Sequence, residues 1–377
     1  MNYMKGRILF LALGLVFFHF SLAQEAKDTI KDFSNYNRKL STSVFFVGRY
    51  NVSMNEDIDF KGVHHTNPAE AVGNSFDIKY VRVQGIFHLN DKISTNVLVN
   101  LADFKSDPKG KVLENAYVKY AYDKYINIQF GQFRPYFGLE DVFSFQLENS
   151  YDWSNQYNLF GANGWQSFQL GAAFTGSLVD SGVPLSYYFS VYNGNGKNQV
   201  SDDNDQKNYT LRLEYKFKGL RLGANGGTSR LGNKTGYAYG ADVQADYVFS
   251  PLFELTGDAE YKRGTNFSEF YASTLDVPNL DDFQMQGFYI VPKLRYNYDK
   301  PRVRAFEASF RYEILDPNMS ISGNSYQTLT PMLSVVGSGD YQAKISIVGV
   351  FNRVKNNVPD TNHYNSNLFI TQIQVHF

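Results

Sequence analysis

The sequence predicts an all-β protein, a transmembrane antiparallel β-barrel of about 16 strands. Three observations predict it: an export signal without a later apolar helix, blocks of alternating polar and apolar residues, and connections of alternating length. The 377 residues include 32 Phe and 28 Tyr, yet the mean hydropathy is −0.36. A wall with one apolar and one polar face accounts for both properties.

The N-terminal residues 1–23 have the features of a secretory signal peptide. Lys5 and Arg7 make the start positive, residues 8–18 are apolar, and Ser21-Leu22-Ala23 offers the small residues of a cleavage site. A short membrane anchor is the alternative, but a run of about 11 apolar residues is well short of the ~20 that a spanning helix needs. We therefore expect the protein to be exported.

The remaining sequence has no run of ~18 apolar residues, so no transmembrane helix is expected. A closed barrel is the other structure that spans a bilayer, because it pairs every backbone N–H and C=O internally. We expect residues 24–39 to form a short polar extension and residues 40–377 to form a barrel in the bacterial outer membrane, in contact with its lipid.

The composition excludes several classes of function. The absence of Cys excludes disulfide scaffolds, thiolate metal sites and cysteine nucleophiles. With 36 Lys+Arg against 37 Asp+Glu, the net charge is −1, so the chain lacks the excess of positive charge that is typical of nucleic-acid-binding proteins. No nucleic-acid partner is expected.

Alternation with a period of two is the main structural pattern. In residues 209–218, Tyr, Leu and Phe occupy every second position, while Thr, Arg, Glu and Lys occupy the positions between them. One face of such a strand needs hydrocarbon and the other needs water. Sixteen blocks are predicted to be strands: 40–53, 75–89, 92–104, 110–122, 124–131, 164–177, 183–193, 207–218, 219–229, 235–249, 250–263, 283–298, 302–315, 328–337, 340–353 and 364–377.

The connections between these blocks are predicted to alternate strictly in length, as short periplasmic turns and longer outside loops do in outer-membrane barrels. The short ones carry turn residues: Asn90-Asp91, Asp123-Lys124, Lys218-Gly219, Ser250-Pro251, Asp299-Lys300-Pro301 and Ser338-Gly339. The longer ones are expected at 54–74, 105–109, 132–163, 194–206, 230–234, 264–282, 316–327 and 354–363.

Residues 80–148 resemble the phosphate-selective porin O/P family in its Bacteroidetes-type form. The resemblance rests on Val81–Gly85 (VRVQG), Leu113–Tyr120 (LENAYVKY) and above all Gly131–Glu140 (GQFRPYFGLE), with further similarity at Asn163–Gln166 and Val191–Gly196. It implies a 16-stranded trimeric porin, and it implies that loop 132–163 folds into the barrel and narrows the pore. The alternative for this strongly aromatic loop is that it caps the barrel mouth or clasps a neighbouring subunit.

Basic residues on the polar faces are candidates for an anion-conducting ladder along the lumen. They are Arg82, Lys119, Arg212, Lys216, Lys293 and Arg295. The alternative is that they pair across strands with acids such as Glu114, Glu214, Glu307 and Glu313 and only hold the wall together.

Arg134 is the candidate for the constriction, because the family-like motif places it where the inward loop begins. The same loop carries Glu140, Asp141, Glu148 and Asp152. A filter dedicated to phosphate needs an excess of positive charge, whereas this loop has four acids and one Arg. The name of the family therefore does not identify the solute that this protein transports.

Other motifs indicate no catalytic or metal site. Adjacent rings such as His64-His65 rarely make a metal site without a carboxylate clamp. The acidic run at 202–205 lacks the spacing and the Gly of an EF-hand, and Gly227–Thr235 departs from the P-loop pattern. No HExxH or GxSxG motif occurs. A Ser-dependent outer-membrane lipase using a His near position 363 is the remaining enzyme alternative.

The sequence therefore predicts an outer-membrane porin, without enzyme activity, cofactor or metal, that forms a homotrimer. Small hydrophilic solutes or ions, including phosphate or other anions, would diffuse passively through its water-filled lumen. The alternative is a plugged barrel with a structural or adhesin-type role, whose outside loops are its working surface.

Overall fold

The computed structural model describes residues 38–106, 112–143, 150–199, 201–202, 205–337, 342–354 and 367–377. The predicted signal peptide and all but the last two residues of the polar extension lie outside these ranges, as do Glu148 and His363.

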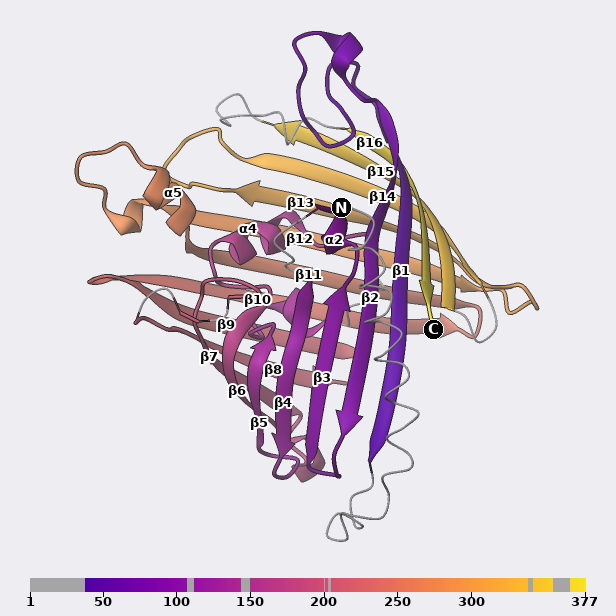
Figure 1. Ribbon diagram of the computed structural model, residues 1–377. Helices are drawn as coiled ribbons and strands as arrows, with labels where there is room; N and C mark the ends of the chain where they lie inside the picture. The colour runs from indigo at the N-terminus through magenta and orange to yellow at the C-terminus, as the bar shows by residue number, and fades with distance from the viewer. Residues whose placement is uncertain are drawn as a thin grey trace, which may run out of the picture.

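The described residues form a closed antiparallel barrel of sixteen strands, in which each strand pairs with its sequence neighbours and β1 pairs with β16 (Figure 1). The strands are β1 (Lys39–Ser53), β2 (Asn74–His88), β3 (Ile93–Asn100), β4 (Leu113–Ala121), β5 (Asn127–Phe133), β6 (Gln169–Ser177), β7 (Leu185–Tyr192), β8 (Asn208–Phe217), β9 (Leu220–Leu231), β10 (Lys234–Ser250), β11 (Phe253–Thr265), β12 (Gln284–Asn297), β13 (Val303–Asp316), β14 (Tyr326–Gly337), β15 (Gln342–Val354) and β16 (Leu368–His376). The predicted fold class and the sixteen predicted strands are confirmed.

The burial pattern is the inverse of that of a water-soluble protein. On β8, Leu211 and Leu213 point outward and are exposed, whereas Thr210 and Arg212, at the alternate positions, point inward and are buried. The same inversion holds on β16, where Phe369 and Ile373 are exposed and Gln372 is buried. The outer face is therefore built for lipid, and the polar face lines the interior.

Short turns connect consecutive strands at one end of the barrel, and side chains in these turns explain why the strands end there. The Asn90 side chain accepts hydrogen bonds from the backbone N–H groups of Lys92 and Ile93, and Asp123 does the same for Tyr125 and Ile126. Such Asx turns satisfy the backbone groups that leave the sheet.

The predicted strict alternation of connection lengths is wrong at one outside loop. Strands β9 and β10 are joined by Gly232-Asn233 alone, and their pairing continues up to Leu231 and Lys234. Gly232 has a φ of +59°, which allows a tight hairpin where the sequence pattern favoured a longer loop at 230–234.

Most predicted strand boundaries move by one to three residues, and two of the larger shifts have a local cause. Strand β3 ends at Asn100 rather than at 104, because the Asn100 side chain accepts the backbone N–H groups of Val81 and Ala102 and takes the chain out of the ladder. Strand β6 begins at Gln169 rather than at 164, because Trp165 and Gln166 belong to the preceding connection.

The helices are short and lie in the connections. They are η2 (Pro68–Glu70), α2 (Asp103–Ser106), α3 (Leu139–Val142), α4 (Asn155–Ala162), η3 (Val179–Ser181), α5 (Phe267–Ala272) and η4 (Leu280–Asp282). Among the described residues, no helix has the length and apolar character needed to cross a membrane.

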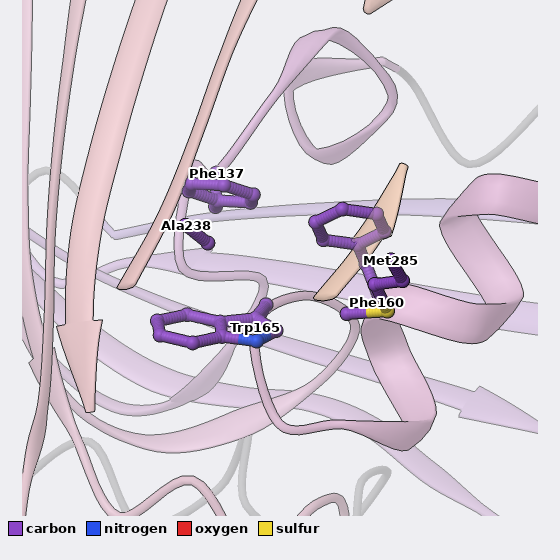
Figure 2. Close-up of a cluster of buried hydrophobic side chains, with 5 residues drawn as sticks. All are labelled: Phe137, Phe160, Trp165, Ala238 and Met285. Atoms are coloured by element: carbon purple, nitrogen blue, oxygen red, sulfur yellow. The ribbon is translucent and has the colours of Figure 1, made fainter. Parts of the chain in front are cut away.

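The main apolar cluster lies inside the barrel. Phe137, Phe160 and Trp165, all from the connection between β5 and β6, pack together and against Ala238 of β10 and Met285 of β12 (Figure 2). The ring centroids of Phe137 and Phe160 are 6.1 Å apart. A connection that buries its rings against the inner wall has a fixed path through the barrel.

Candidate functional site in the barrel lumen

The described residues of the connection between β5 and β6, 134–143 and 150–168, are called the lumen segment below. They are bonded to strands on several sides of the barrel. On one side, the backbone N–H of Leu139 donates to Oε1 of Glu260 on β11, and that of Asn155 donates to Oε1 of Glu313 on β13, both at 2.7 Å. Near its middle, Oδ2 of Asp152 lies 3.1 Å from Arg49 of β1. Because these strand side chains point inward, the lumen segment lies across the interior of the barrel.

Asp152 is the centre of one anchor. Its carboxylate lies 2.9 Å from Nζ of Lys79 and accepts the hydroxyl of Tyr80 at 3.0 Å. Burial opposes ionisation of this group, but Lys79 and Arg49 outweigh burial and hold the pKa of Asp152 far below its usual range. Asp152 is thus a permanent anion that fixes the lumen segment to β1 and β2.

Arg311 of β13 holds the same stretch from the opposite direction. Its guanidinium donates to Oγ of Ser150 at 2.6 Å and to the carbonyl oxygen of Asp152 at 2.5 Å. The Tyr151 ring between these residues packs on an apolar cluster of β14, β15 and β16. Residues 150–153 are therefore fixed by strands on both sides of the β1–β16 seam.

The two acids of α3 have different partners. Glu140 accepts the backbone N–H of Ser154 at 2.8 Å and the Ser154 hydroxyl, so it joins α3 to the start of α4. Asp141 accepts the backbone N–H of Phe137 at 3.0 Å and Nε2 of Gln166 at 3.2 Å. Burial raises the pKa of Glu140 above its usual range and that of Asp141 to about 6.

Arg134 is bonded to the lumen segment itself. Its Nη1 donates to the carbonyl oxygen of Glu140 at 2.9 Å and its Nη2 to that of Phe143, and the guanidinium lies 5.3 Å from the Trp153 ring centroid. In the part of the chain that the structure describes, no carboxylate lies within ion-pair distance of it. Arg134 also borders a cavity of about 240 Å³.

Four of the other predicted cations are neutralised by strand acids. Arg82 forms a bidentate ion pair with Glu114 at 2.8 and 2.9 Å. The fully buried Arg212 pairs with Asp242 at 2.8 Å. The remaining two pairs are Lys216 with Glu214 at 3.6 Å and Arg295 with Glu307 at 2.7 Å. This geometry favours a wall-holding role for these four residues.

Lys293 and Lys119 lie elsewhere on the polar wall. Lys293 borders a cavity of about 490 Å³ together with Arg295, Lys344 and Glu307. Lys119 of β4 is half-buried opposite Gln129 of β5, and no ion pair of Lys119 is found among the described residues. Arg134 and Lys119 are thus predicted cations for which the described residues provide no ion-pair partner, although the charge of Arg134 acts on nearby Asp141.

Sequence reasoning missed the strand residues that anchor the lumen segment. They are Arg49, Lys79, Glu260, Lys262 and Arg311. Each is a charge on the polar face of a predicted strand, which was a visible signal. Their partners depend on the path of the lumen segment, which the alternation pattern does not contain.

The two predicted histidines form separate pairs in the first outside loop. His64 lies 3.3 Å from Asp57, and His65 lies 3.4 Å from Asp59. Among the residues that can be described, no group of three or more His, Asp or Glu side chains is placed to hold a metal ion. Asp203 and Asn204 of the acidic run lie outside the described residues.

The family can now be assigned from sequence and fold together. A family model described as phosphate-selective porin O and P matches residues 50–295. The chain belongs to this family. This porin is accordingly an outer-membrane channel for passive diffusion of small hydrophilic solutes, and its family and fold are those of a channel rather than an enzyme.

Solved porin structures share the fold of this porin at low sequence identity. The outer membrane channel DcaP of Acinetobacter baumannii is 14% identical, with 90% of this chain and 97% of that chain covered and a TM-score of 0.60. OmpF of Salmonella typhi is 16% identical (92% and 99% covered, TM-score 0.60), and an anion-selective porin from Comamonas acidovorans is 9% identical (90% and 99% covered, TM-score 0.59). A search of curated proteins gave no match.

Proposed function

We propose that this porin is a weakly selective diffusion channel, in which Arg134 biases the choice of ions, rather than a dedicated phosphate filter. The observation that carries the proposal is the pairing of the lumen charges. Arg82, Arg212, Lys216 and Arg295 each lie against a carboxylate. Among the described residues, the Arg134 guanidinium contacts backbone carbonyls and aromatic rings but forms no ion pair.

The proposed mechanism has no catalytic step. Paired charges present alternating signs to a passing ion and bind neither sign strongly, so flux follows the concentration gradient. The lumen segment limits the size of the solute, because its anchors to β1, β11 and β13 fix it across the interior. Phosphate and other small anions would pass as members of this broad solute class.

The reversal potential in a salt gradient tests the proposal. In planar bilayers with a tenfold KCl gradient, the wild-type channel should show a small anion preference, and Arg134→Ala should shift the reversal potential toward cations. Arg212→Ala would leave a buried acid unpaired, so Lys216→Ala, whose side chain is half-exposed, is the better control. Strong anion selectivity that survives Arg134→Ala would contradict the proposal, and correctly folded protein without conductance steps would indicate a plugged barrel.

We further propose that residues 1–23 are removed on export and that the mature porin is a homotrimer. The positively charged start, the apolar run at residues 8–18 and the small residues of the cleavage site support the removal of residues 1–23. The family resemblance supports the homotrimer. Intact mass of the purified protein reports cleavage, and light scattering in detergent reports the number of subunits.

A further inference from the structure

A cavity of about 240 Å³ lies beside the start of the lumen segment and collects polar groups of both signs. Arg134 and Asp141 of the lumen segment border it, together with Gln129 of β5. The remaining border is mainly aromatic and comes from Tyr117, Phe133, Tyr136, Phe143 and Tyr188, with Asn115 and Val142. A volume of this size holds a small organic solute rather than a single ion.

Two of these residues have a polar atom without a partner. The Oε1 of Gln129 accepts the Tyr136 hydroxyl at 3.2 Å, but the Nε2 of Gln129 has no hydrogen-bond partner among the described residues. The Oδ2 of Asp141 accepts two hydrogen bonds, but its Oδ1 accepts none from any described residue. Both side chains are strongly buried, with exposed fractions of 4% for Gln129 and 3% for Asp141.

Buried polar atoms without partners are rare in folded proteins, because each one costs about 1–3 kcal/mol of desolvation. The unpartnered Nε2 of Gln129 is a donor, and the unpartnered Oδ1 of Asp141 is an acceptor. Both atoms belong to residues that border the same cavity. A ligand that satisfies both must accept a hydrogen bond at one end and donate one at the other.

The charges at the cavity set a second requirement. Arg134 and Asp141 carry opposite charges, yet they form no ion pair with each other in the described structure, and the guanidinium is bonded to two carbonyl oxygens instead. A simple anion at Arg134 would meet the Asp141 carboxylate, and a simple cation at Asp141 would meet the guanidinium. A solute with both charges pairs with both groups.

We propose that this cavity is a subsite for small zwitterions, of which a free α-amino acid is the simplest. The carboxylate of the solute would pair with Arg134 and accept the Nε2 hydrogen of Gln129, and its ammonium group would donate to Oδ1 of Asp141. The aromatic border would receive an apolar side chain. The inference rests on the proposed diffusion function and names a solute class for it.

Four derivatives of one amino acid separate the charges. L-leucine is a zwitterion, N-acetyl-L-leucine an anion, L-leucinamide a cation, and N-acetyl-L-leucinamide is neutral. Each is titrated onto single channels in a planar bilayer, and the concentration that halves the open-channel current is measured. For the wild-type channel, L-leucine should act at a concentration about tenfold lower than any of the other three, a difference of about 1.4 kcal/mol.

Two conservative variants identify the groups. Asp141→Asn keeps an oxygen for Phe137 and Gln166, and it should remove the advantage of L-leucine over N-acetyl-L-leucine. Gln129→Met keeps the length of the side chain and removes the Nε2 donor. It should raise the blocking concentrations of L-leucine and N-acetyl-L-leucine by the same factor. Glu254→Gln, an acid-to-amide change at the separate 490 Å³ cavity, is the matched control and should leave all four values unchanged.

Equal block by L-leucine and N-acetyl-L-leucine in the wild type would overturn the inference in favour of an anion site. Equal block by all four compounds, or by none, would overturn it in favour of a cavity without selectivity. In each of these cases the open-channel current itself remains, so the diffusion function stands. The absence of any open-channel current from folded protein would instead contradict the diffusion function.

Discussion

The backbone N–H of Leu139 donates a 2.7 Å hydrogen bond to Oε1 of Glu260, a residue 121 positions later in the chain. The second oxygen, Oε2, accepts Nε2 of Gln156 at 3.0 Å and lies 3.1 Å from Nζ of Lys262. One side chain of β11 thus holds both short helices of the lumen segment, α3 through Leu139 and α4 through Gln156. Lys262 in turn donates to Gln166, near the end of the segment.

The first prediction concerns this anchor. Glu260→Ala removes both hydrogen bonds and leaves the fully buried Lys262 without its acid, a change that costs about 3–5 kcal/mol. The lumen segment should move away from β11, and the single-channel conductance should change, with increased current noise. Glu260→Gln also leaves Lys262 without its acid, but it keeps an acceptor for Leu139, so it should change the conductance less than Glu260→Ala does. Identical conductance in the Ala variant and the wild type would show that Glu260 does not position the segment.

The second prediction concerns Gly138, which precedes α3 with a φ of +102°. A Cβ atom at this position would overlap Oε1 of Glu260, the acceptor of the Leu139 hydrogen bond. Gly138→Ala should therefore disturb the same anchor and change the conductance in the same direction as Glu260→Ala.

The matched control for this variant is Gly196→Ala. Gly196 has a similar φ of +87°, but a Cβ atom there would meet nothing within 4 Å. Gly196→Ala places an Ala at a positive φ without a steric contact. Gly138→Ala adds the contact with Glu260 and the strain of φ +102° and ψ 174°, a region essentially restricted to Gly, so the contact is read from a conductance change that matches that of Glu260→Ala. Equal heat-denaturation temperatures and equal conductance for the two variants would remove the contact from the explanation.

The strands were predictable because their signal is local. A period of two needs only neighbouring residues, and the exposed Leu211 and buried Arg212 follow from it directly. The pairing of Arg82 with Glu114 could be offered only as an alternative, because it depends on how β2, β3 and β4 are staggered in the barrel.

The interior was less predictable because it depends on contacts between residues far apart in the chain. The aromatic composition of the lumen segment indicated that it packs against something, but not that Trp165 would donate to the carbonyl oxygen of Thr265. The motif drew attention to Arg134, yet its bonds to the carbonyls of Glu140 and Phe143 follow from the turn that α3 makes. Turn geometry inside a long loop has no periodic signal.

The third prediction is a pH dependence caused by Asp141. Burial raises its pKa to about 6, whereas the unfolded chain would ionise near the usual 3.8. The folded state therefore holds the proton more tightly than the unfolded state, and the contribution of Asp141 to the free energy of unfolding falls as pH rises from about 4 to about 6. Above about pH 6 the lumen also gains a negative charge.

Reversal potentials measured between pH 4.5 and 8 should shift toward cations as pH rises, with a midpoint near 6. Asp141→Asn should remove this transition, because the amide does not ionise. Glu140, whose pKa is also raised by burial, can add a second transition that persists in this variant and disappears in Glu140→Gln. A transition near pH 6 that is unchanged in Asp141→Asn would assign it to another group.

The fourth prediction tests which face of the wall meets lipid. Leu213 of β8 is 42% exposed on the outer face, so Leu213→Arg places a charge in hydrocarbon at a cost of about 2–4 kcal/mol near the bilayer centre. The amount of folded barrel in the membrane should fall. Thr256→Arg on the inward face of β11, beside the 490 Å³ cavity, should assemble normally. Normal assembly of Leu213→Arg would contradict the assigned orientation.

The last prediction compares two small residues on the outer face to test the proposed trimer. Gly85 of β2 lies between Thr42 and Val97, and a Cβ atom there would meet nothing within 4 Å. Ala308 of β13 lies between Leu294 and Leu333, two larger apolar side chains. A polar Thr beside a Gly without a side chain suits a protein neighbour better than lipid, so for the proposed trimer we expect the subunit contact at the face of β1–β3.

Gly85→Trp should therefore block close approach of subunits and lower the trimer fraction, while the monomer barrel stays folded. Ala308→Trp introduces the same ring into the lipid-facing surface, where aromatic side chains are tolerated, and should leave the trimer intact. Light scattering in detergent distinguishes the two. Loss of the trimer in Ala308→Trp but not in Gly85→Trp would place the contact on the opposite side of the barrel, because it would mean that β12–β14 face a neighbour and β1–β3 face lipid.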